Sequence, residues 1–426
     1  MKYIFYLFIF TAPVFSVTLN ELTSYAIENS ITTKQASAKN SLASIKLKEN
    51  RASRYGELNF IADATHYNVD RTLAPLIPST ISSGTPITTS KDIFSGGVSY
   101  SVALFTGFAK SRDIEIDEIS SKMSQIQSHL TKEQLIYNIR SLYLSILTLQ
   151  EIKEAQSRYI KALKELNTII AKEVELGKKA KIDFIKSKAD IEFAQTKEAI
   201  LKADIKTALA TISLLSGKEV TQVEPIEIEI KEPIFNIDNL YIQGITLSKI
   251  KQRDLELLKA TKSIQKSNSS NLPQLKLNSY FGKNYAKDER NDWDDETLWQ
   301  VGVNLKYNIL DFGKQDASTQ KAKIIKLQAS LKKEQSLLEI KKLLIEAIAE
   351  IQKSYAQFLG SNSGYNLSLK SEKIEKARYE SNVATLNDLL LAKSKTKLAQ
   401  SKLIESRYSY QKSIYYLDYL LEKGVK

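Results

Sequence analysis

The 426-residue sequence contains no cysteine, only two histidines, 14 glycines and 7 prolines. The lack of cysteine excludes a disulfide framework, a thiolate or iron–sulfur site and a lipid anchor on an N-terminal cysteine. His66 and His129 lie too far apart in sequence to form a metal-binding histidine pair. No G-x-x-x-x-G-K-[ST] phosphate loop occurs. We therefore expect no enzyme, no metal site and no cofactor, and the scarcity of glycine and proline favours long helices.

The formal net charge is +12, which raises the question of nucleic-acid binding. The lysines are dispersed and mixed with glutamates, and no basic stripe interleaved with aromatic residues is present. This pattern is typical of solvated helix faces, so we expect no nucleic-acid partner.

Residues 1–16 have the features of a secretory signal peptide: Lys2, an apolar run over Tyr3–Phe15 and a cleavage site ending at Ser16. An N-terminal membrane anchor is the alternative, but a spanning helix needs roughly 20 apolar residues. No other segment is apolar enough to cross a membrane as a helix. The sequence therefore predicts an exported protein that could enter a membrane only as a β-barrel.

Two segments 205 positions apart repeat each other. Residues 174–197 and 379–402 share six identities, among them Asp183 with Asp388. The same offset aligns alternating segments far upstream, around Val98 and Val303. An offset maintained over such a distance indicates two copies of one structural unit.

The predicted organisation has four parts. Residues 1–16 are the signal peptide, 17–217 the first repeat, 218–237 an extended connector and 238–426 the second repeat. The predicted strands cover about 58–68 and 96–106 in the first repeat, and about 274–285 and 299–310 in the second, with loops at 69–95 and 286–297. Helices are expected over 19–53, 110–175, 181–216, 238–270 and from 313 to about 421, the last of these interrupted at 360–364 and by a turn near Asn382. Each repeat is thus helix–strand–strand–long helix–helix.

The strands alternate apolar and polar residues and carry tyrosine or tryptophan near their ends, which is typical of outer-membrane barrel strands. In the last strand Val301, Val303, Leu305, Tyr307 and Ile309 are expected on one face, and Gly302, Asn304, Lys306 and Asn308 on the other. Four strands cannot close a barrel, and an open edge in lipid leaves backbone groups unpaired. We therefore expect a homotrimer with twelve strands.

The helices carry too many lysines and glutamates to lie in lipid, so they must project into water. The apolar spacing of three and four residues predicts coiled-coil seams. About 65 residues would form a rod of roughly 100 Å. The predicted fold is therefore mostly α with a membrane β-barrel, in which a trimer forms a 12-stranded barrel and a 12-helix periplasmic tunnel.

Several short patterns resemble those of the TolC-like outer-membrane efflux protein family. Gly177, Asp183 and Ser216-Gly217 follow the family's spacing in the first repeat; Tyr379 and Asp388 match in the second, where Asn382 replaces a glycine; and Leu272-Pro273 precedes a strand. The resemblance covers about residues 17–424. It implies a passive channel in the outer-membrane lipid that works with a periplasmic adaptor (membrane fusion protein) and an inner-membrane transporter, in drug efflux or type I secretion.

The resemblance also implies a periplasmic gate. Asp388 matches an aspartate that rings the closed end of the tunnel, and the second ring position is Leu391 here. Asp183 and Tyr379 match an acceptor and a donor that hold the helix pairs shut. The family's arginine falls at Ala384, and Lys178, Lys179 and Lys181 are the cations available to replace it. Converging carboxylates at a pore repel each other and bind cations. Both aspartates also suit ordinary helix capping.

Two other classes of protein remain as alternatives to a channel. A periplasmic coiled-coil adaptor normally has one helical hairpin, whereas this chain has two. A coiled-coil scaffold without a barrel would not need a signal peptide and four alternating strands.

Overall fold

The computed structural model describes residues 16–84, 87–287 and 292–424. The predicted signal peptide, residues 1–16, lies outside this part of the chain apart from Ser16.

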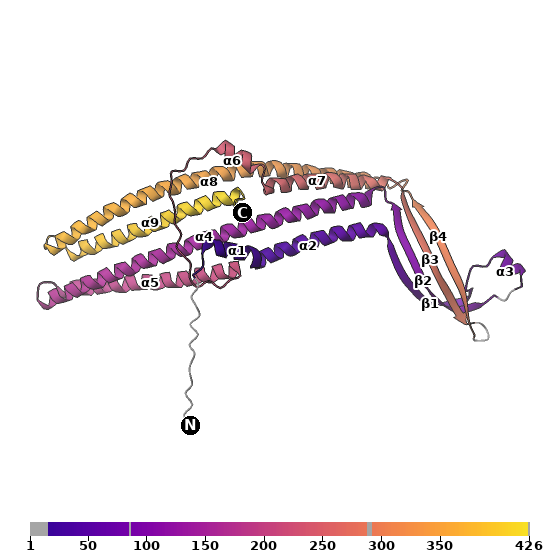
Figure 1. Cartoon of the computed structure of the whole chain (residues 1–426), viewed down its shortest axis with the longest axis horizontal. Helices are drawn as coiled ribbons and strands as arrows, with labels where there is room; N and C mark the ends of the chain where they lie inside the picture. Colours follow the sequence, from indigo (N-terminus) through magenta and orange to yellow (C-terminus); the bar gives the residue numbers. More distant parts are fainter. Residues whose placement is uncertain (1–15, 85–86, 288–291, 425–426) are drawn as a thin grey trace, which may run out of the picture. The chain divides into compact units, whose positions relative to one another are not determined.

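Each half of the chain contains helices, two strands, a helix of 67 residues and a further long helix, in that order (Figure 1). The first half comprises α1 (Leu19–Asn29), α2 (Ile31–Ala52), β1 (Glu57–Thr72), the short α3 (Pro78–Ser82), β2 (Thr89–Phe105), α4 (Ala109–Glu175) and α5 (Lys181–Ser216). The second comprises α6 (Ile237–Gly244), α7 (Ser248–Asn268), β3 (Gln274–Lys287), β4 (Trp293–Lys306), α8 (Lys314–Glu380) and α9 (Leu386–Leu420).

The chain folds into two compact units, and both take residues from both halves. Unit 1 contains Met1–Ala38, Ile126–Lys251 and Gln335–Lys426, and unit 2 contains Lys39–Gln125 and Gln252–Glu334. Unit 2 holds the sheet together with segments of α2, α4, α7 and α8. None of the helices in the described part of the chain is both long enough and apolar enough to span a membrane.

The four strands form one antiparallel sheet in the order β1-β2-β3-β4. Within the described residues, β1 and β4 therefore each have one edge without a strand partner. The register places Phe60, Val98, Phe281 and Trp299 in one row across the sheet. The next row, on the opposite face, contains Asn59, Ser99, Tyr280 and Gln300. The sheet thus has one apolar and one polar face.

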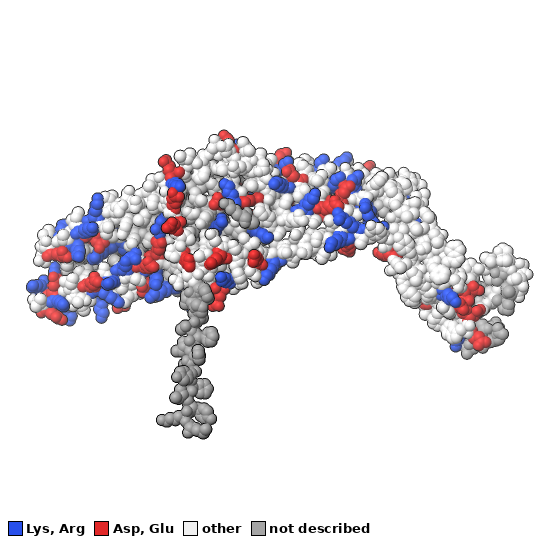
Figure 2. Space-filling view, viewed as in Figure 1, with Lys and Arg blue, Asp and Glu red and all other residues white. Residues whose placement is uncertain are grey.

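The apolar face is not covered within the chain. Phe60 is 77% exposed and Trp299 is 73% exposed, and Val301 and Val303 beside them are also exposed. Figure 2 shows few charged residues over the middle of the sheet, whereas both signs of charge are mixed over the helices. Apolar exposure on this scale indicates a face that contacts lipid or another molecule.

On the polar face two glycines, Gly97 and Gly282, are paired across β2 and β3. A Cβ added to Gly97 would lie 2.5 Å from the carbonyl oxygen of Phe281 and 2.8 Å from the hydroxyl of Tyr280. Neighbouring Gly96 has nothing within 4 Å of the same position. A Cβ on Gly282 would likewise lie 2.6 Å from the Gly96 carbonyl oxygen. Close packing therefore requires glycine at 97 and 282 but not at 96.

Three helix predictions are wrong. The expected helix at 19–53 breaks at Ser30, whose extended backbone (ψ 147°) ends α1. Its hydroxyl then accepts a hydrogen bond from the Thr33 amide at 3.2 Å and starts α2. The expected helix at 238–270 is divided into α6 and α7.

The third error is the interruption expected at 360–364. The helix α8 is continuous from Lys314 to Glu380. Contacts with α9 hold it on both sides of the two glycines. Ser354 and Ser413 lie 3.1 Å apart between their hydroxyl oxygens, and Thr396 donates to the Ser368 carbonyl at 3.0 Å. Packing of this kind outweighs the cost of about 1 kcal/mol for each helical glycine.

The strand ends also differ from the prediction. β2 begins at Thr89 rather than 96, and β4 covers 293–306 rather than 299–310, so the predicted loops at 69–95 and 286–297 are shorter. The first added residues of β2, Thr89–Asp92, are polar and lack the apolar alternation, but backbone pairing does not require it. β4 ends because its last partner, Gln274, follows Pro273, which has no N–H for the ladder. Tyr307 and Ile309 therefore lie beyond the strand.

Candidate gate at the helical turns

The turns that join α4 to α5 and α8 to α9 have the same hydrogen-bond pattern. In the first turn, the amides of Lys178 and Lys179 donate to the Glu173 carbonyl at 2.8 and 3.3 Å. In the second, the amides of Val383 and Ala384 donate to the Arg378 carbonyl at 2.8 and 3.2 Å. These residues are related by the offset of 205 positions, so the repeat extends to the backbone of the turns.

Gly177 and Asn382 occupy equivalent positions with a left-handed backbone, at φ 69° and 56°. Glycine adopts this conformation without cost, and asparagine is among the residues that tolerate it best. The replacement of the glycine by Asn382 therefore preserves the turn.

A single hydrophobic cluster joins the two hairpins next to these turns. Its buried members come from all four helices: Ile160, Leu163, Leu166, Ile170, Ile191, Ala194, Tyr379, Leu386, Leu389 and Leu390. The shared cluster places the predicted gate residue Tyr379 in the interface between the hairpins, where it is only 5% exposed.

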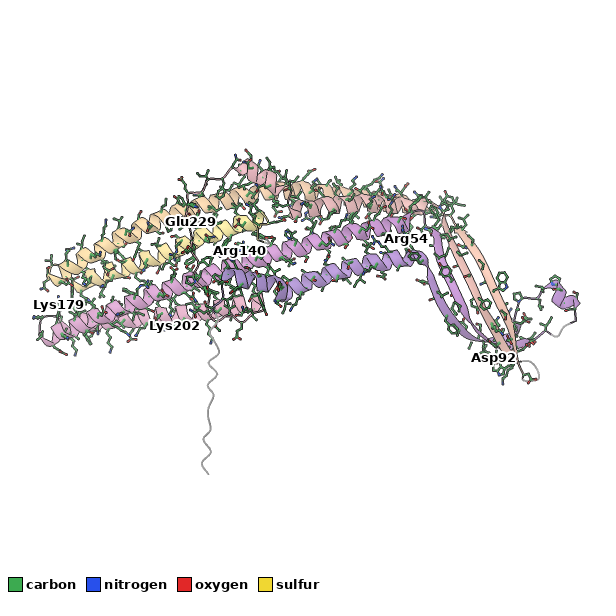
Figure 3. The ribbon with its side chains drawn as sticks, viewed as in Figure 1. Arg54, Asp92, Arg140, Lys179, Lys202 and Glu229 are labelled. Carbon is green, nitrogen blue, oxygen red and sulfur yellow. The ribbon has the colours of Figure 1, made fainter. Side chains whose placement is uncertain are left out.

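Tyr379 contacts the first turn through Lys179. The Lys179 ammonium lies 4.5 Å from the centroid of the Tyr379 ring, a distance typical of a cation–π contact. The same ammonium lies 3.4 Å from Oδ1 of Asn382. Of the three lysines available to replace the arginine, Lys179 is thus the one whose side chain contacts the second turn in the described structure. Figure 3 labels its position at the turns.

The hydroxyl of Tyr379 is buried and has no hydrogen-bond partner among the described residues. Burial raises the pKa of Tyr379, and the nearby charges of Glu173 and Asp183 raise it further. The structure therefore brings Tyr379 near Asp183 without the bond between them that the resemblance implied. The sequence did not indicate Glu173, because the equivalent residue in the second repeat is Arg378 and the two residues are not identical.

Asp388 lies in the first turn of α9 and forms a capping box with Thr385. Its carboxylate accepts hydrogen bonds from the Thr385 amide at 3.0 Å and hydroxyl at 2.7 Å. These bonds lower the pKa of Asp388, with a smaller contribution from Arg378. The capping interpretation is thus correct for Asp388, and it is compatible with a second role because the residue is exposed. Leu391, at the second ring position, is 51% exposed.

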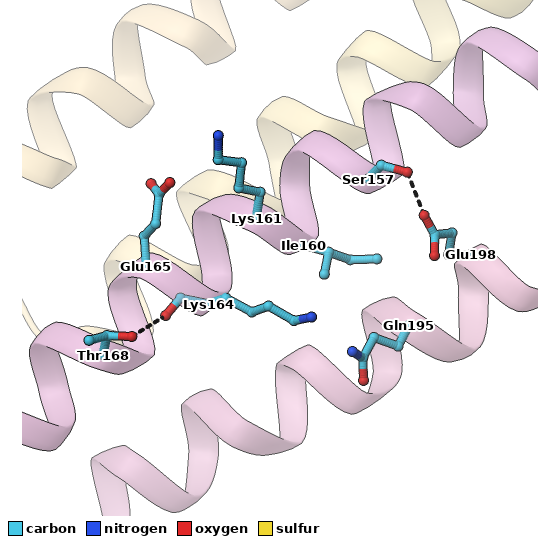
Figure 4. A pocket seen from close by; sticks show the side chains of 8 residues that line it. All are labelled: Ser157, Ile160, Lys161, Lys164, Glu165, Thr168, Gln195 and Glu198. Atoms are coloured by element: carbon cyan, nitrogen blue, oxygen red, sulfur yellow. Dashed lines mark hydrogen bonds between the residues drawn. The ribbon is translucent and has the colours of Figure 1, made fainter.

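A groove on the α4/α5 hairpin provides further polar groups (Figure 4). It has a volume of about 540 Å³ and is lined by Ser157, Ile160, Lys161, Lys164, Glu165, Thr168, Gln195 and Glu198. Ser157 donates to Glu198, which lowers the pKa of that carboxylate together with Lys202. Charged side chains of both signs line the groove, and no histidine is among them. In the described residues, no cluster of three or more potential metal ligands was found.

Comparison with known proteins agrees with the resemblance that the sequence patterns indicated. The sequence model of the family described as "Outer membrane efflux protein" matches residues 22–218 and 248–421. No curated protein matches the chain.

Solved structures share the fold at low sequence identity. The outer membrane channel CmeC of Campylobacter jejuni is 17% identical, with a TM-score of 0.80 over 95% of this chain and 86% of the other. The open-state outer membrane channel MtrE of Neisseria gonorrhoeae is 16% identical, with a TM-score of 0.77 over 96% and 89%. The outer membrane protein VceC of Vibrio cholerae is 14% identical, with a TM-score of 0.77 over 95% and 96%. These comparisons favour a channel over an adaptor or a scaffold.

Proposed function

Because the chain belongs to the outer membrane efflux protein family, we propose that three copies form the passive exit duct of a tripartite efflux or type I secretion system. As a member of this family it is an outer-membrane transport protein and not an enzyme. In the proposal, a twelve-stranded barrel crosses the outer membrane and twelve helices form a tunnel in the periplasm.

The observation that carries the proposal is the four-stranded sheet with an exposed apolar face. Its outer strands, β1 and β4, each lack a neighbour on one side within the described chain. In a bilayer, each unpaired backbone group costs several kcal/mol. Pairing β4 of one copy with β1 of the next removes this cost, and three copies supply twelve strands.

Two exposed helix seams support the same assembly. On α5, residues spaced three or four apart are all exposed: Ile182, Ile185, Ala189, Phe193, Thr196, Ile200, Ala203, Thr207, Ala210 and Leu214. On the unit 1 part of α8, the exposed apolar residues are Leu338, Ile345, Leu359, Leu367 and Ile374. Two different seams on one chain suit a head-to-tail interface, which closes into a ring. We define these sets as the α5 seam and the α8 seam.

We further propose that the two turns form the periplasmic end of the tunnel and its gate. Asp388 would contribute a ring of three carboxylates in the trimer. Lys179 would hold the hairpins together through Tyr379 and Asn382, taking the place of the arginine that is Ala384 here. A periplasmic adaptor and an inner-membrane transporter would be the partners of this end, as the family's function requires.

The function is tested by purifying the chain in detergent and recording conductance in planar bilayers. We expect a cross-linkable trimer that conducts ions and is blocked by cations from the side of the helical turns. Asp388→Ala should weaken the block. A monomer without conductance would contradict the proposed duct, and an unchanged block would remove Asp388 from the pore.

The proposed role of Lys179 in keeping the two hairpins together is tested in the same conductance recordings. Lys179→Ala should increase conductance because it removes the contacts with Tyr379 and Asn382. Lys178→Ala is the matched control, since its side chain is exposed. Equal conductance in both variants would argue against the role of Lys179.

A further inference from the structure

The connector between α5 and α6 contains an extended segment, residues 225–232, which we call the strap (Figure 1). Its side chains alternate in burial. Ile226, Ile228 and Ile230 pack against the hydrophobic clusters of unit 1, whereas Glu227 and Glu229 are exposed. This is the pattern of a β-strand with one face on a core.

The strap is fixed at both ends by buried tyrosines. The Tyr143 hydroxyl donates to the Glu224 carbonyl at 2.7 Å, and the Tyr410 hydroxyl donates to the Lys231 carbonyl at 2.8 Å. Just before the strap, Val223 forms a parallel bridge with Val17. The segment is therefore held as an extended edge and does not depend on its own backbone bonds for its shape.

The backbone amides of this edge are unpaired. Pro225 has no N–H, and the seven amides of residues 226–232 donate to no acceptor in the described structure. At about 3.3 Å per residue, these seven residues present an edge of roughly 23 Å. Open edges of this kind are the templates on which extended peptides add as a further strand.

Next to the strap lies a cavity of about 520 Å³, lined by Glu151, Ile226, Glu227, Ile228, Glu229 and Arg407. Arg407 is paired with Glu151, so these two charges already compensate each other. The cavity leaves room for side chains of an added strand, which give strand addition its specificity.

The exposed charges of the strap indicate the chemistry of its partner. Glu227, Glu229 and Glu232 face solvent with one lysine, Lys231, which pairs with Glu229 at 2.7 Å. Three acids and one lysine give a net charge of −2. A second copy of the strap would place like charges opposite each other, which is unfavourable. A strand with basic residues at alternate positions would be attracted instead.

We propose that the strap is a docking edge for a partner protein, which adds an extended segment with lysine or arginine at alternate positions. Glu229, labelled in Figure 3, marks the centre of this edge. The proposal relies on the proposed function only in placing the strap in the periplasm, where such a partner would be found.

The experiment uses the purified full-length protein and a peptide probe of sequence Thr-Lys-Val-Lys-Val-Lys-Val-Thr. Amide hydrogen exchange is measured with and without the peptide. We expect rapid exchange of the 226–232 amides in the protein alone, and at least about tenfold slower exchange of alternate amides with peptide. A peptide N-methylated at its valines and its lysines should not bind, because neither of its edges can then complete the ladder.

A pair of variants tests the charge recognition. Glu227→Gln with Glu229→Gln should weaken peptide binding roughly threefold to tenfold. Glu192→Gln with Glu405→Gln, exposed glutamates on helices, should leave it unchanged.

Three results would overturn the proposal. Slow exchange of the strap amides before peptide is added would mean that another copy already covers the edge. Unchanged exchange with peptide would mean that no strand adds. Equal binding of the N-methylated peptide would mean that charge alone attracts it. Since none of these readouts requires ion conduction, a failure of the conductance test would count only against the proposed duct.

Discussion

Tyr143 is the residue that connects the start of the folded chain to the connector. Its side chain is fully buried in unit 1. The single proton of its hydroxyl is shared between the Glu224 carbonyl at 2.7 Å and the Val17 carbonyl at 3.0 Å. Burial raises the pKa of Tyr143 to about 12, so the hydroxyl remains a donor at any physiological pH.

We expect Tyr143→Phe to destabilise the protein by about 1–3 kcal/mol, because two carbonyls would lose their donor in a buried site. Thermal unfolding followed by circular dichroism measures the change. Tyr55→Phe is the control, since Tyr55 is 79% exposed. A loss of stability no greater than that of the control would show that water replaces the hydroxyl.

Asp388 provides a prediction on pH. Hydrogen bonds from Thr385 lower the pKa of its carboxyl in the folded protein. A lowered folded pKa means that the capping box contributes fully above the usual aspartate value of about 3.9 and is lost as the pH falls through the folded pKa. We expect amides in the first turn of α9 to lose protection in that acidic range. Asp388→Asn should remove this pH dependence, and a persistent dependence would assign it to another group.

At the level of the elements, the sheet separates an apolar from a polar face residue by residue. Val303 pairs with Leu277 in an apolar row, and its neighbour Asn304 pairs with Lys276 on the opposite face. This alternation makes adjacent positions on β4 respond differently to the same substitution.

We expect Val303→Lys to impair membrane assembly, at a cost of about 2–4 kcal/mol near the midplane. Asn304→Lys should be tolerated because its side chain would face the water-filled side. Heat-modifiable migration of the trimer in outer-membrane fractions distinguishes the two. Similar assembly of both variants would contradict the proposed orientation of the sheet.

Two adjacent glycines of β2, Gly97 and Gly96, allow a matched comparison of the same substitution at a packed and an open position. Gly97→Ala should reduce the yield of assembled protein, since the new Cβ would meet backbone atoms of β3 at 2.5 and 2.7 Å. Gly96→Ala should assemble normally, because its Cβ meets nothing within 4 Å. The same heat-modifiability measurement applies, and normal assembly of Gly97→Ala would show that β2 and β3 can separate locally.

At the level of the whole molecule, assembly depends on surfaces that the single chain leaves exposed. The α5 seam has more members than the α8 seam, and Phe193 near its middle is 74% exposed. We expect Phe193→Lys to reduce trimer formation, because it places a charge in the proposed interface between copies. Glu192→Lys, one residue off the seam, should trimerise normally. Chemical cross-linking quantifies both, and equal trimer yields would place the interface elsewhere.

Much of the fold could be predicted because its signals are local. The four strands, the long helices and the turns at Gly177 and Asn382 follow from residues close together in the chain. The errors arose where distant contacts decide. Packing on α9, for example, carries α8 through 360–364. The break at Ser30 is an exception, because the bond between its hydroxyl and the Thr33 amide is local. At the start of β2, Thr89, Ser90 and Asp92 pair with β1 without any apolar alternation to indicate a strand.

For the candidate gate, too, some features could be predicted from the sequence and others depend on tertiary contacts. The offset of 205 residues identified Asp183 and Asp388 as equivalent positions, because a repeat can be detected from the chain alone. Tyr379 was indicated only by the family resemblance. Which of three lysines reaches Tyr379 could not be predicted, since Lys178, Lys179 and Lys181 are similar in sequence and differ only in where the turn directs each side chain. That Tyr379 is buried without a hydrogen-bond partner likewise depends on the opposite hairpin.

By itself the sequence determined the duplicated order of helices and strands, because hydrogen bonding in helices and turns and the alternation of strands involve residues that are neighbours in the chain. Only the tertiary structure decided where the strands end, which lysine contacts the second turn and that the amides of the strap remain unpaired. These features depend on groups that are not neighbours in the chain, from Thr72 and Thr89 at the start of β2 to Lys179 and Tyr379 in the two hairpins, and their positions are set by packing.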